Sequence, residues 1–226
     1  MNAELRALPD AAAVASAAAD LLVEHVAAGH HIALSGGSTP KAAYRLAADR
    51  LDDWSGATLW LGDDRAVPAD DERSNFRMVR EQLGDGAPLE RVRTELGPDA
   101  AAADYEARLR AALGDAPALD LALMGMGPDA HTASLFGGKP AVEERERLVV
   151  GVPEPGMDPR VPRVTMTLPL FNAAAEVVFL VAGADKAEAM ARAFGPQPDP
   201  SAPSALVRPA SGRLVVLCDE AAAARL

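Results

Sequence analysis

The stretch HHIALSGGSTPKAAYRLA, residues 30–47, carries the signals of a strand, a turn and a helix on which the predicted fold depends. Residues 30–34 form a short apolar run, which predicts a buried strand. Residues 35–40 are turn formers, and Pro40 suits the first position of a new helix because its missing N–H is not needed there. Ala43, Leu46 and Ala47 give that helix an apolar face. The segment therefore predicts a strand, a tight turn and a helix in succession.

Strands and helices continue to alternate on both sides of this unit. Asp10 is expected to cap a helix that ends at Gly29, and Ser74 a helix that ends near Gly84. Further strands are predicted at residues 57–61, 119–124, 148–152, 163–168, 176–181 and 213–217, with an edge strand at 91–96 and helices at 98–113, 184–194 and 219–225. This order predicts an α/β fold with a mostly parallel sheet covered on both faces, in a single domain of residues 1–226.

The composition is that of a globular protein. The chain has 226 residues, of which 49% are apolar and 24% are charged. These proportions exclude a disordered or fibrous chain. Cys218 is the only cysteine, so a disulfide scaffold and a cysteine-ligated zinc site are excluded as well.

The charge balance limits the partners. Lys plus Arg is 22 and Asp plus Glu is 33, which gives a net charge of −11. An acidic surface argues against nucleic acid and against an anionic membrane as partners, although a locally basic site can still bind a phosphorylated molecule. No apolar stretch approaches the roughly 20 residues that a membrane span needs, and the N-terminus lacks the basic start of a signal peptide. We therefore expect a cytoplasmic protein.

The loops that follow the predicted strands deserve most attention, because ligands of parallel sheets bind beyond the carboxyl ends of the strands. The first such loop contains Gly36, Gly37, Ser38 and Thr39 and leads into a helix. Glycines allow close approach of an anion, and a helix N-terminus offers free N–H groups. The spacing is not that of a Walker loop. Phosphate binding is favoured over a simple glycine-rich turn.

The second loop begins with Asp63, Asp64 and Arg65. Neighbouring carboxylates beside an arginine suit either polar contacts with a substrate or acid–base chemistry. An ordinary solvated loop is an equally good interpretation of these residues alone. Ser74 and Asn75 follow ten residues later, where Ser74 is expected to act as a helix cap.

The third loop, residues 125–132, contains Asp129 and His131. A histidine on such a loop is able to act as a general base near neutral pH, and this role is favoured over a structural one for His131. The other histidines, at positions 25, 30 and 31, are expected to be structural. Gly125, Gly127 and Ala130 also match a dinucleotide-binding pattern, but only weakly.

Other features of the sequence are less specific. Lys186 stands at the head of a helix after a strand, where phosphate contact and a solvated lysine are equally good interpretations. Two proline-rich stretches, residues 151–162 and 195–203, are expected to be surface loops rather than pocket walls. No histidine or cysteine cluster predicts a metal site, and no G-x-S-x-G motif predicts an acyl-serine mechanism.

Together these segments resemble the 6-phosphogluconolactonase family. The matching stretches are residues 34–41, 60–66, 124–137, 163–175 and 183–190, of which MGMGPDAHTASLFG at 124–137 is the most specific. The resemblance implies a three-layer, modified Rossmann-like fold. It also implies hydrolysis of 6-phosphoglucono-1,5-lactone in the oxidative pentose phosphate pathway, without a metal or an organic cofactor.

The resemblance also assigns roles to residues. The histidine of the family's GMG-x-D-x-H motif matches His131, the acid of its strand-end motif matches Asp63, and its SGGS loop matches residues 35–38. Ala130 stands where the family usually has glycine, so it would be strained if that position needs a positive φ. Phe136 stands where the related deaminases carry a glutamate, which favours lactone hydrolysis over deamination.

The predicted mechanism uses His131 as a general base that activates water, with Asp129 orienting its ring. Asp63 is grouped with these two as a catalytic residue, and together with Arg65 it is expected to bound the sugar end. The substrate-binding residues are predicted to be Gly36, Gly37, Ser38, Thr39, Arg65, Asn75, Arg163 and Lys186, with no metal ligand. The expected partner is a small sugar-phosphate lactone, and the protein is expected to be a monomer or a weak homo-oligomer. A deaminase, a sugar-phosphate sensor and, least favoured, a nicotinamide-dependent oxidoreductase are the alternatives.

Overall fold

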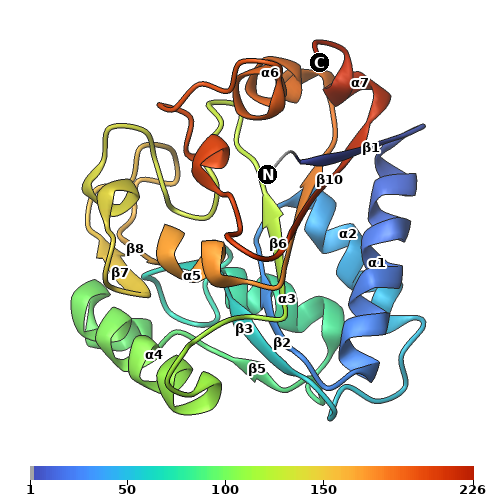
Figure 1. The fold of residues 1–226 in the computed structure, drawn as a ribbon. Helices are drawn as coiled ribbons and strands as arrows, with labels where there is room; N and C mark the ends of the chain where they lie inside the picture. The colour runs from blue at the N-terminus through green and yellow to red at the C-terminus, as the bar shows by residue number, and fades with distance from the viewer. Residues whose placement is uncertain (1–2) are drawn as a thin grey trace.

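The computed structural model describes residues 3–226 and is built around two sheets (Figure 1). All strands of the larger sheet run parallel, in the order β1-β10-β9-β6-β2-β3-β5. These strands are β1 (Glu4–Leu8), β2 (His31–Leu34), β3 (Thr58–Leu61), β5 (Leu89–Glu90), β6 (Leu121–Gly125), β9 (Glu176–Val181) and β10 (Arg213–Asp219). The smaller sheet is antiparallel, in the order β4-β8-β7, and contains β4 (Asp63–Arg65), β8 (Arg163–Met166) and β7 (Val149–Val152).

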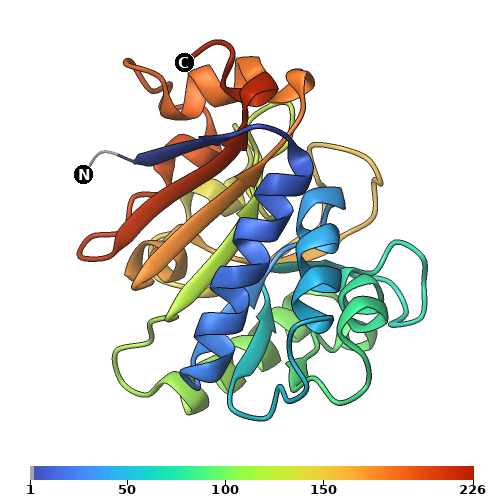
Figure 2. The ribbon, with the colours of Figure 1, turned by 90° about the vertical axis from the view of Figure 1, so that its right-hand side faces the viewer.

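Helices and the small sheet cover the two faces of the large sheet, giving three layers (Figures 1 and 2). One face carries α1 (Ala11–Ala27), α2 (Ser38–Ala48) and α3 (Asn75–Leu83). The other carries α4 (Pro98–Leu113), α5 (Leu168–Ala173), α6 (Ala187–Phe194), α7 (Glu220–Ala223) and the small sheet. Successive strand residues point to opposite faces, so Ile32 and Leu34 of β2 enter one apolar cluster and Ala33 enters the other. The predicted α/β class, its three layers and its parallel sheet are confirmed.

The strand order creates a crevice at the carboxyl ends of β2 and β6. After β2 the chain passes through α2 to β3 on one side, and it later returns as β6 on the other side of β2. Loops that leave two neighbouring strands in opposite directions leave an opening between them, where ligands of such sheets bind. The loops after β2 and β6 are the two glycine-rich segments of the sequence.

Several predicted elements are confirmed in detail. Helix α4 spans the predicted residues 98–113, and β9 spans the predicted residues 176–181. The Asp10 side chain accepts a hydrogen bond from the Ala13 N–H at 2.8 Å, and the Ser74 hydroxyl accepts one from the Arg77 N–H at 3.2 Å. Both residues therefore cap helices as expected.

Other boundaries were predicted wrongly. Helix α2 begins at Ser38, so Pro40 is its third residue, because Gly37 with φ 114° already turns the chain into the helix. The expected edge strand at 91–96 is wrong. The strand at this edge of the large sheet is β5, and residues 94–96 form a 3₁₀ turn that ends at Gly97. The segment 163–168 ends as a strand at Met166, since Leu168 begins α5.

Two strands were missed altogether. Strand β1 lies at the edge of the large sheet and is largely exposed, so it lacks the apolar pattern of a buried strand. Strand β4 lies inside the expected polar loop at 62–73. Its three residues are polar and show no apolar pattern, and they form a strand only by pairing with β8. Within residues 3–226, no helix combines the length and the apolarity needed to cross a bilayer.

Candidate active site

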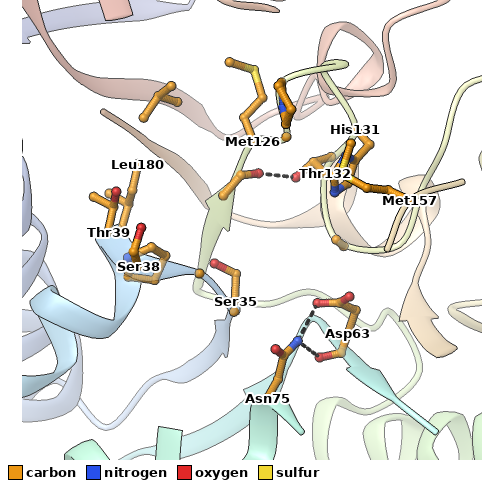
Figure 3. A pocket seen from close by; sticks show the side chains of 18 of the residues that line it. Ser35, Ser38, Thr39, Asp63, Asn75, Met126, His131, Thr132, Met157 and Leu180 are labelled. Carbon is orange, nitrogen blue, oxygen red and sulfur yellow. Dashed lines mark hydrogen bonds between the residues drawn. The ribbon is translucent and has the colours of Figure 1, made fainter. Parts of the chain in front are cut away.

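A cavity of about 300 Å³ opens at the crevice between β2 and β6 (Figure 3). Its walls come from the loops after β2, β6 and β9, from β4, from the start of α3 and from the segment before β8. All eight predicted substrate-binding residues line it, together with Asp63 and His131: Gly36, Gly37, Ser38, Thr39, Arg65, Asn75, Arg163 and Lys186. Asp129 lies behind His131 and contacts its ring. The topology thus brings together residues that are up to 150 positions apart (186 minus 36).

The loop after β2 is held from one side by a tyrosine. The hydroxyl of the buried Tyr44 accepts a hydrogen bond from the Ser35 N–H and donates one to the Ser35 carbonyl, both at 2.9 Å. Burial raises the pKa of Tyr44 far above its ordinary range, so the hydroxyl stays protonated and keeps its donor. This contact fixes the loop that carries the N–H groups at the start of α2.

Gly36 has no room for a side chain. A Cβ atom built on it would lie 2.2 Å from the Asn75 side-chain oxygen. The Asn75 amide in turn donates to the Asp63 carbonyl at 2.9 Å and to the Asp63 carboxylate at 3.1 Å. Asn75 therefore packs the first loop against the second, and the glycine permits that close approach.

Figure 3 places Ser38 and Thr39 on one side of the pocket and His131 on the opposite side. Ser38 and Thr39 begin α2, where backbone N–H groups lack partners within the helix and the helix dipole favours an anion. Lys186 also lines the pocket, and its ammonium group lies 3.3 Å from the exposed Asp185 carboxylate. This side of the pocket is suited to a phosphate group.

The neighbouring acids Asp63 and Asp64 have different surroundings. Asp64 points away from the pocket, and its carboxylate accepts hydrogen bonds from the Asn75 N–H at 2.7 Å and the Arg65 N–H at 2.8 Å. Burial raises the pKa of Asp64 to about 6, although these backbone hydrogen bonds oppose the shift. Asp64 therefore anchors the start of α3, whereas Asp63 lines the pocket.

His131 is supported by a carboxylate. Its Nδ1 lies 2.5 Å from Asp129 Oδ1, and its ring is 16% exposed. Partial burial alone would raise the pKa of Asp129, but the hydrogen bond and the charge of His131 outweigh it and lower the pKa overall. With Nδ1 bound to the carboxylate, Nε2 is the nitrogen left to exchange a proton with a bound molecule.

The loop that carries His131 is strained. Ala130 has φ 66° and Ala133 has φ 47°, values in the left-handed region that alanine rarely adopts. Position 130 thus has the positive φ at which an alanine in place of glycine is strained. The Ala130 carbonyl accepts hydrogen bonds from the Ser204 N–H at 3.0 Å and the Ser204 hydroxyl at 2.8 Å. Contacts outside the loop therefore hold the strained conformation in place.

Phe136 packs against two residues that line the pocket, His131 and Arg163. The ring centroids of His131 and Phe136 are 4.7 Å apart, and the Arg163 guanidinium lies 5.5 Å from the centre of the Phe136 ring. Arg163 is 3% exposed and donates to the carbonyls of Met157 and Pro159, both at 3.1 Å. Burial lowers the pKa of Arg163, and the charge of a nearby aspartate, Asp63, opposes that shift.

The prediction for the first proline-rich stretch is wrong. Residues 151–162 are not a loop remote from the pocket, since Met157 and Asp158 line it and Met157 lies beside His131 (Figure 3). The stretch folds back onto the pocket because Arg163 binds its carbonyl groups. The second stretch, residues 195–203, contributes nothing to the pocket lining.

Sequence reasoning also missed residues that support the site. Ser134 is fully buried and its hydroxyl donates to the Asp63 carboxylate at 2.6 Å. Tyr44 hydrogen-bonds to the loop after β2, and Ser204 hydrogen-bonds to the loop after β6. Polar residues inside otherwise apolar segments, such as Ser134 in HTASLF, were the available signal, because a buried polar group needs a partner.

Comparisons with known proteins agree with this arrangement. The family model described as glucosamine-6-phosphate isomerases/6-phosphogluconolactonase matches residues 9–216. A 6-phosphogluconolactonase of Nostoc sp. is 38% identical over 243 aligned positions, covering 100% of this chain and 99% of that protein.

Solved structures share the fold. The 6-phosphogluconolactonase of Trypanosoma cruzi superposes with a TM-score of 0.91 at 29% identity, covering 100% of this chain and 98% of that one. A monomeric glucosamine-6-phosphate deaminase superposes with a TM-score of 0.76 at 18% identity, covering 99% of this chain and 100% of that one. The second likeness concerns the fold alone.

The contact between Gly36 and Asn75 predicts a sharp effect of one methyl group. We expect Gly36→Ala to lower the free energy of unfolding by about 1–3 kcal/mol, since Asn75 must move and leave its bonds to Asp63. Gly86→Ala is the matched control, because its added Cβ would meet nothing within 4 Å. Urea denaturation measures both. Equal midpoints for the two variants would contradict the proposed close approach.

The raised pKa of Asp64 predicts a pH-dependent stability. The folded protein holds this proton to about pH 6, whereas an unfolded aspartate releases it near pH 3.9. The contribution of Asp64 to the free energy of unfolding is therefore fully present below about pH 3.9. It is lost as the pH rises to about 6, by up to roughly 1.4 kcal/mol per pH unit. Carboxyl ¹³C NMR should show a titration midpoint near 6 that is absent in Asp64→Asn; a midpoint below 4 would refute this.

Proposed function

The chain belongs to the family of glucosamine-6-phosphate isomerases and 6-phosphogluconolactonases, and we propose that it hydrolyses 6-phospho-D-glucono-1,5-lactone to 6-phospho-D-gluconate. We infer the substrate from relatives that match over almost their whole length, such as the 6-phosphogluconolactonase of Nostoc sp.. The proposed reaction belongs to the oxidative pentose phosphate pathway. The observation that carries the proposal is the position of His131, across the pocket from the start of α2 (Figure 3), with its Nδ1 2.5 Å from Asp129 Oδ1. A base at one end and an anion site at the other suit a phosphorylated lactone.

The phosphate is proposed to bind where Ser38 and Thr39 begin α2, with Lys186 supplying a positive charge. Hydroxyl groups, free backbone N–H groups and an ammonium group are the donors that phosphate requires. Binding of the remote phosphate positions the lactone carbonyl C1 near His131, so binding energy serves to orient the reacting atoms. Arg65, Asn75 and Arg163 complete the polar wall on the sugar side.

In the proposed reaction, water attacks C1 while Nε2 of His131 accepts its proton. A tetrahedral intermediate forms with negative charge on the former carbonyl oxygen, and N–H donors of the pocket would stabilise it. The intermediate collapses by breaking the bond between C1 and the ring oxygen. His131 then returns the proton to that oxygen, which gives the open-chain acid. Asp129 keeps the proton on Nδ1 and stabilises the imidazolium that forms transiently.

No metal or organic cofactor takes part in this proposed sequence. A lactone is an ester, so a bound water molecule and one base are sufficient reactants. Asp63 is proposed to hold the wall of the pocket rather than to transfer the proton, because both of its carboxylate oxygens already accept hydrogen bonds, from Asn75 and Ser134.

Deamination of an amino-sugar phosphate is the alternative within the same family. Its chemistry would need an additional acid beside the histidine. The side chain packed on His131 is Phe136, which has no proton to exchange. This contact favours the lactone.

The remaining expectations stay predictions. They are a cytoplasmic location, a monomer or weak homo-oligomer, the absence of nucleic-acid and membrane partners, and a single domain of residues 1–226. The net charge of −11 supports the absence of nucleic acid as a partner.

A coupled assay tests the proposed function. Glucose-6-phosphate dehydrogenase generates the lactone, and 6-phosphogluconate dehydrogenase reports the acid that forms. Because the lactone also hydrolyses spontaneously, the signal is the acceleration over a blank without protein. Folded protein that accelerates nothing, or that releases ammonia from glucosamine 6-phosphate, would overturn the proposal.

His131→Ala should lower kcat by about 10²–10⁴-fold, the usual contribution of a general base. Asp129→Asn should cause a smaller loss, because the histidine remains but its ring is no longer held by a charge. The same coupled assay measures both. Turnover within a factor of about two of wild type in His131→Ala would exclude the base role.

Two lysines near helix starts provide a matched pair for the phosphate site. Lys186 lines the pocket, whereas Lys41 in α2 is exposed and lies outside it. We expect Lys186→Ala to raise KM by about tenfold or more, the equivalent of losing a charge-assisted hydrogen bond of roughly 1.5–3 kcal/mol. Lys41→Ala should leave KM unchanged. Equal effects on KM would mean that the general charge of the protein matters rather than this site.

A further inference from the structure

The loop that carries His131 is tied to Asp63 by one short hydrogen bond. Ser134 follows His131 by three positions, is 0% exposed, and donates from its hydroxyl to Asp63 Oδ2 at 2.6 Å. A hydrogen bond to a carboxylate is about twice as strong as one between neutral groups, and burial strengthens it further. The bond joins residues that are 71 positions apart in the chain.

A second contact of Ser134 leads to the same sheet. Its backbone N–H donates to Thr165 Oγ1 at 3.2 Å, and that hydroxyl donates to the Met166 carbonyl at 2.9 Å. Thr165 of β8 is the direct partner of Asp63 in β4. Ser134 therefore docks the His131 loop onto one rung of the small sheet through both its side chain and its backbone.

The other carboxylate oxygen of Asp63 extends the connection to α3. Oδ1 accepts a hydrogen bond from the Asn75 amide at 3.1 Å, and Asn75 packs on Gly36. Asp63 is thus a buried acceptor between the loop of His131 on one side and the loop that begins α2 on the other. Loss of the Ser134 hydroxyl would therefore first change the distance between His131 and the phosphate-binding end of the pocket.

We propose that Ser134 is a positioning residue of the reaction: by holding Asp63, its hydroxyl sets where the His131 ring stands relative to the bound lactone. The inference rests on the proposed lactone hydrolysis. Ser134 touches neither the substrate nor the proton in transit. Its effect comes through geometry, since a displacement of about 1 Å at a reacting group is able to lower a rate by roughly 10²-fold.

The first test compares three variants in the coupled assay. Ser134→Ala should lower kcat by about tenfold or more with little change in KM, since the phosphate site is untouched. Ser134→Thr, which keeps the hydroxyl, should recover most of that loss. Thr167→Val is the control for stability, because it removes another fully buried hydroxyl, one that donates to the Arg147 carbonyl outside the pocket. It should lower the unfolding midpoint without changing kcat.

The second test is a double-mutant cycle with Asp63→Asn. If Ser134 acts through Asp63, the double variant should lose little more kcat than Asp63→Asn alone, because the same contact is removed twice. Fully additive losses would overturn the proposal. So would a Ser134→Ala enzyme with wild-type kcat, or equal losses in the Ala and Thr variants when both remain folded.

Failure of the proposed function is separable from failure of this inference. A wild-type protein that does not accelerate lactone hydrolysis refutes the function. The position of the His131 ring is then followed by ¹⁵N NMR of its imidazole. Ser134→Ala should shift those signals and Thr167→Val should not. Signals that are unchanged in Ser134→Ala would overturn the positioning role whatever the reaction is.

Discussion

The position of β6 beside β2 in a fully parallel sheet is the constraint on which the rest of the structure depends. These two strands end at the same edge, and their chains leave in opposite directions, toward α2 and toward the loop of His131. We propose that the opening between them takes its anion site from one loop and its base from the other. No single segment contains both functions. They meet because the sheet holds the two strand ends side by side.

The pocket is stabilised by groups that belong to neither function. Tyr44 holds the first loop, Ser204 holds the strained Ala130, and Asp63 lies between Asn75 and Ser134. Each contact satisfies a buried polar group, and each also limits the movement of a loop that lines the pocket. Ala130 and Ala133 adopt left-handed backbone conformations that alanine disfavours, so contacts elsewhere in the structure override the local conformational preference of these residues. The position of His131 is therefore maintained by contacts from several distant parts of the chain.

The sequence was sufficient for the fold class and for the residues expected to bind a substrate, all of which line the candidate pocket. It was insufficient for the contacts that hold this pocket together. Apolar runs and glycine-rich turns predicted the strands, and each loop after a strand contributed the residues expected of it. Strand β4 escaped prediction because three polar residues form a strand only through pairing with β8. The role of residues 151–162 depends on Arg163 binding their carbonyl groups, and that of Ser134 on a carboxylate 71 positions away. Such long-range pairings leave no local pattern.

We propose that one pocket holds the lactone with its reacting carbon at His131 and its phosphate at the start of α2. A crystal structure with the product 6-phosphogluconate bound tests this claim most directly. We expect the carboxylate of the product within hydrogen-bond distance of His131 Nε2, and the phosphate on the side of Ser38, Thr39 and Lys186. A product bound with its phosphate beside His131, or bound outside this pocket, would contradict it.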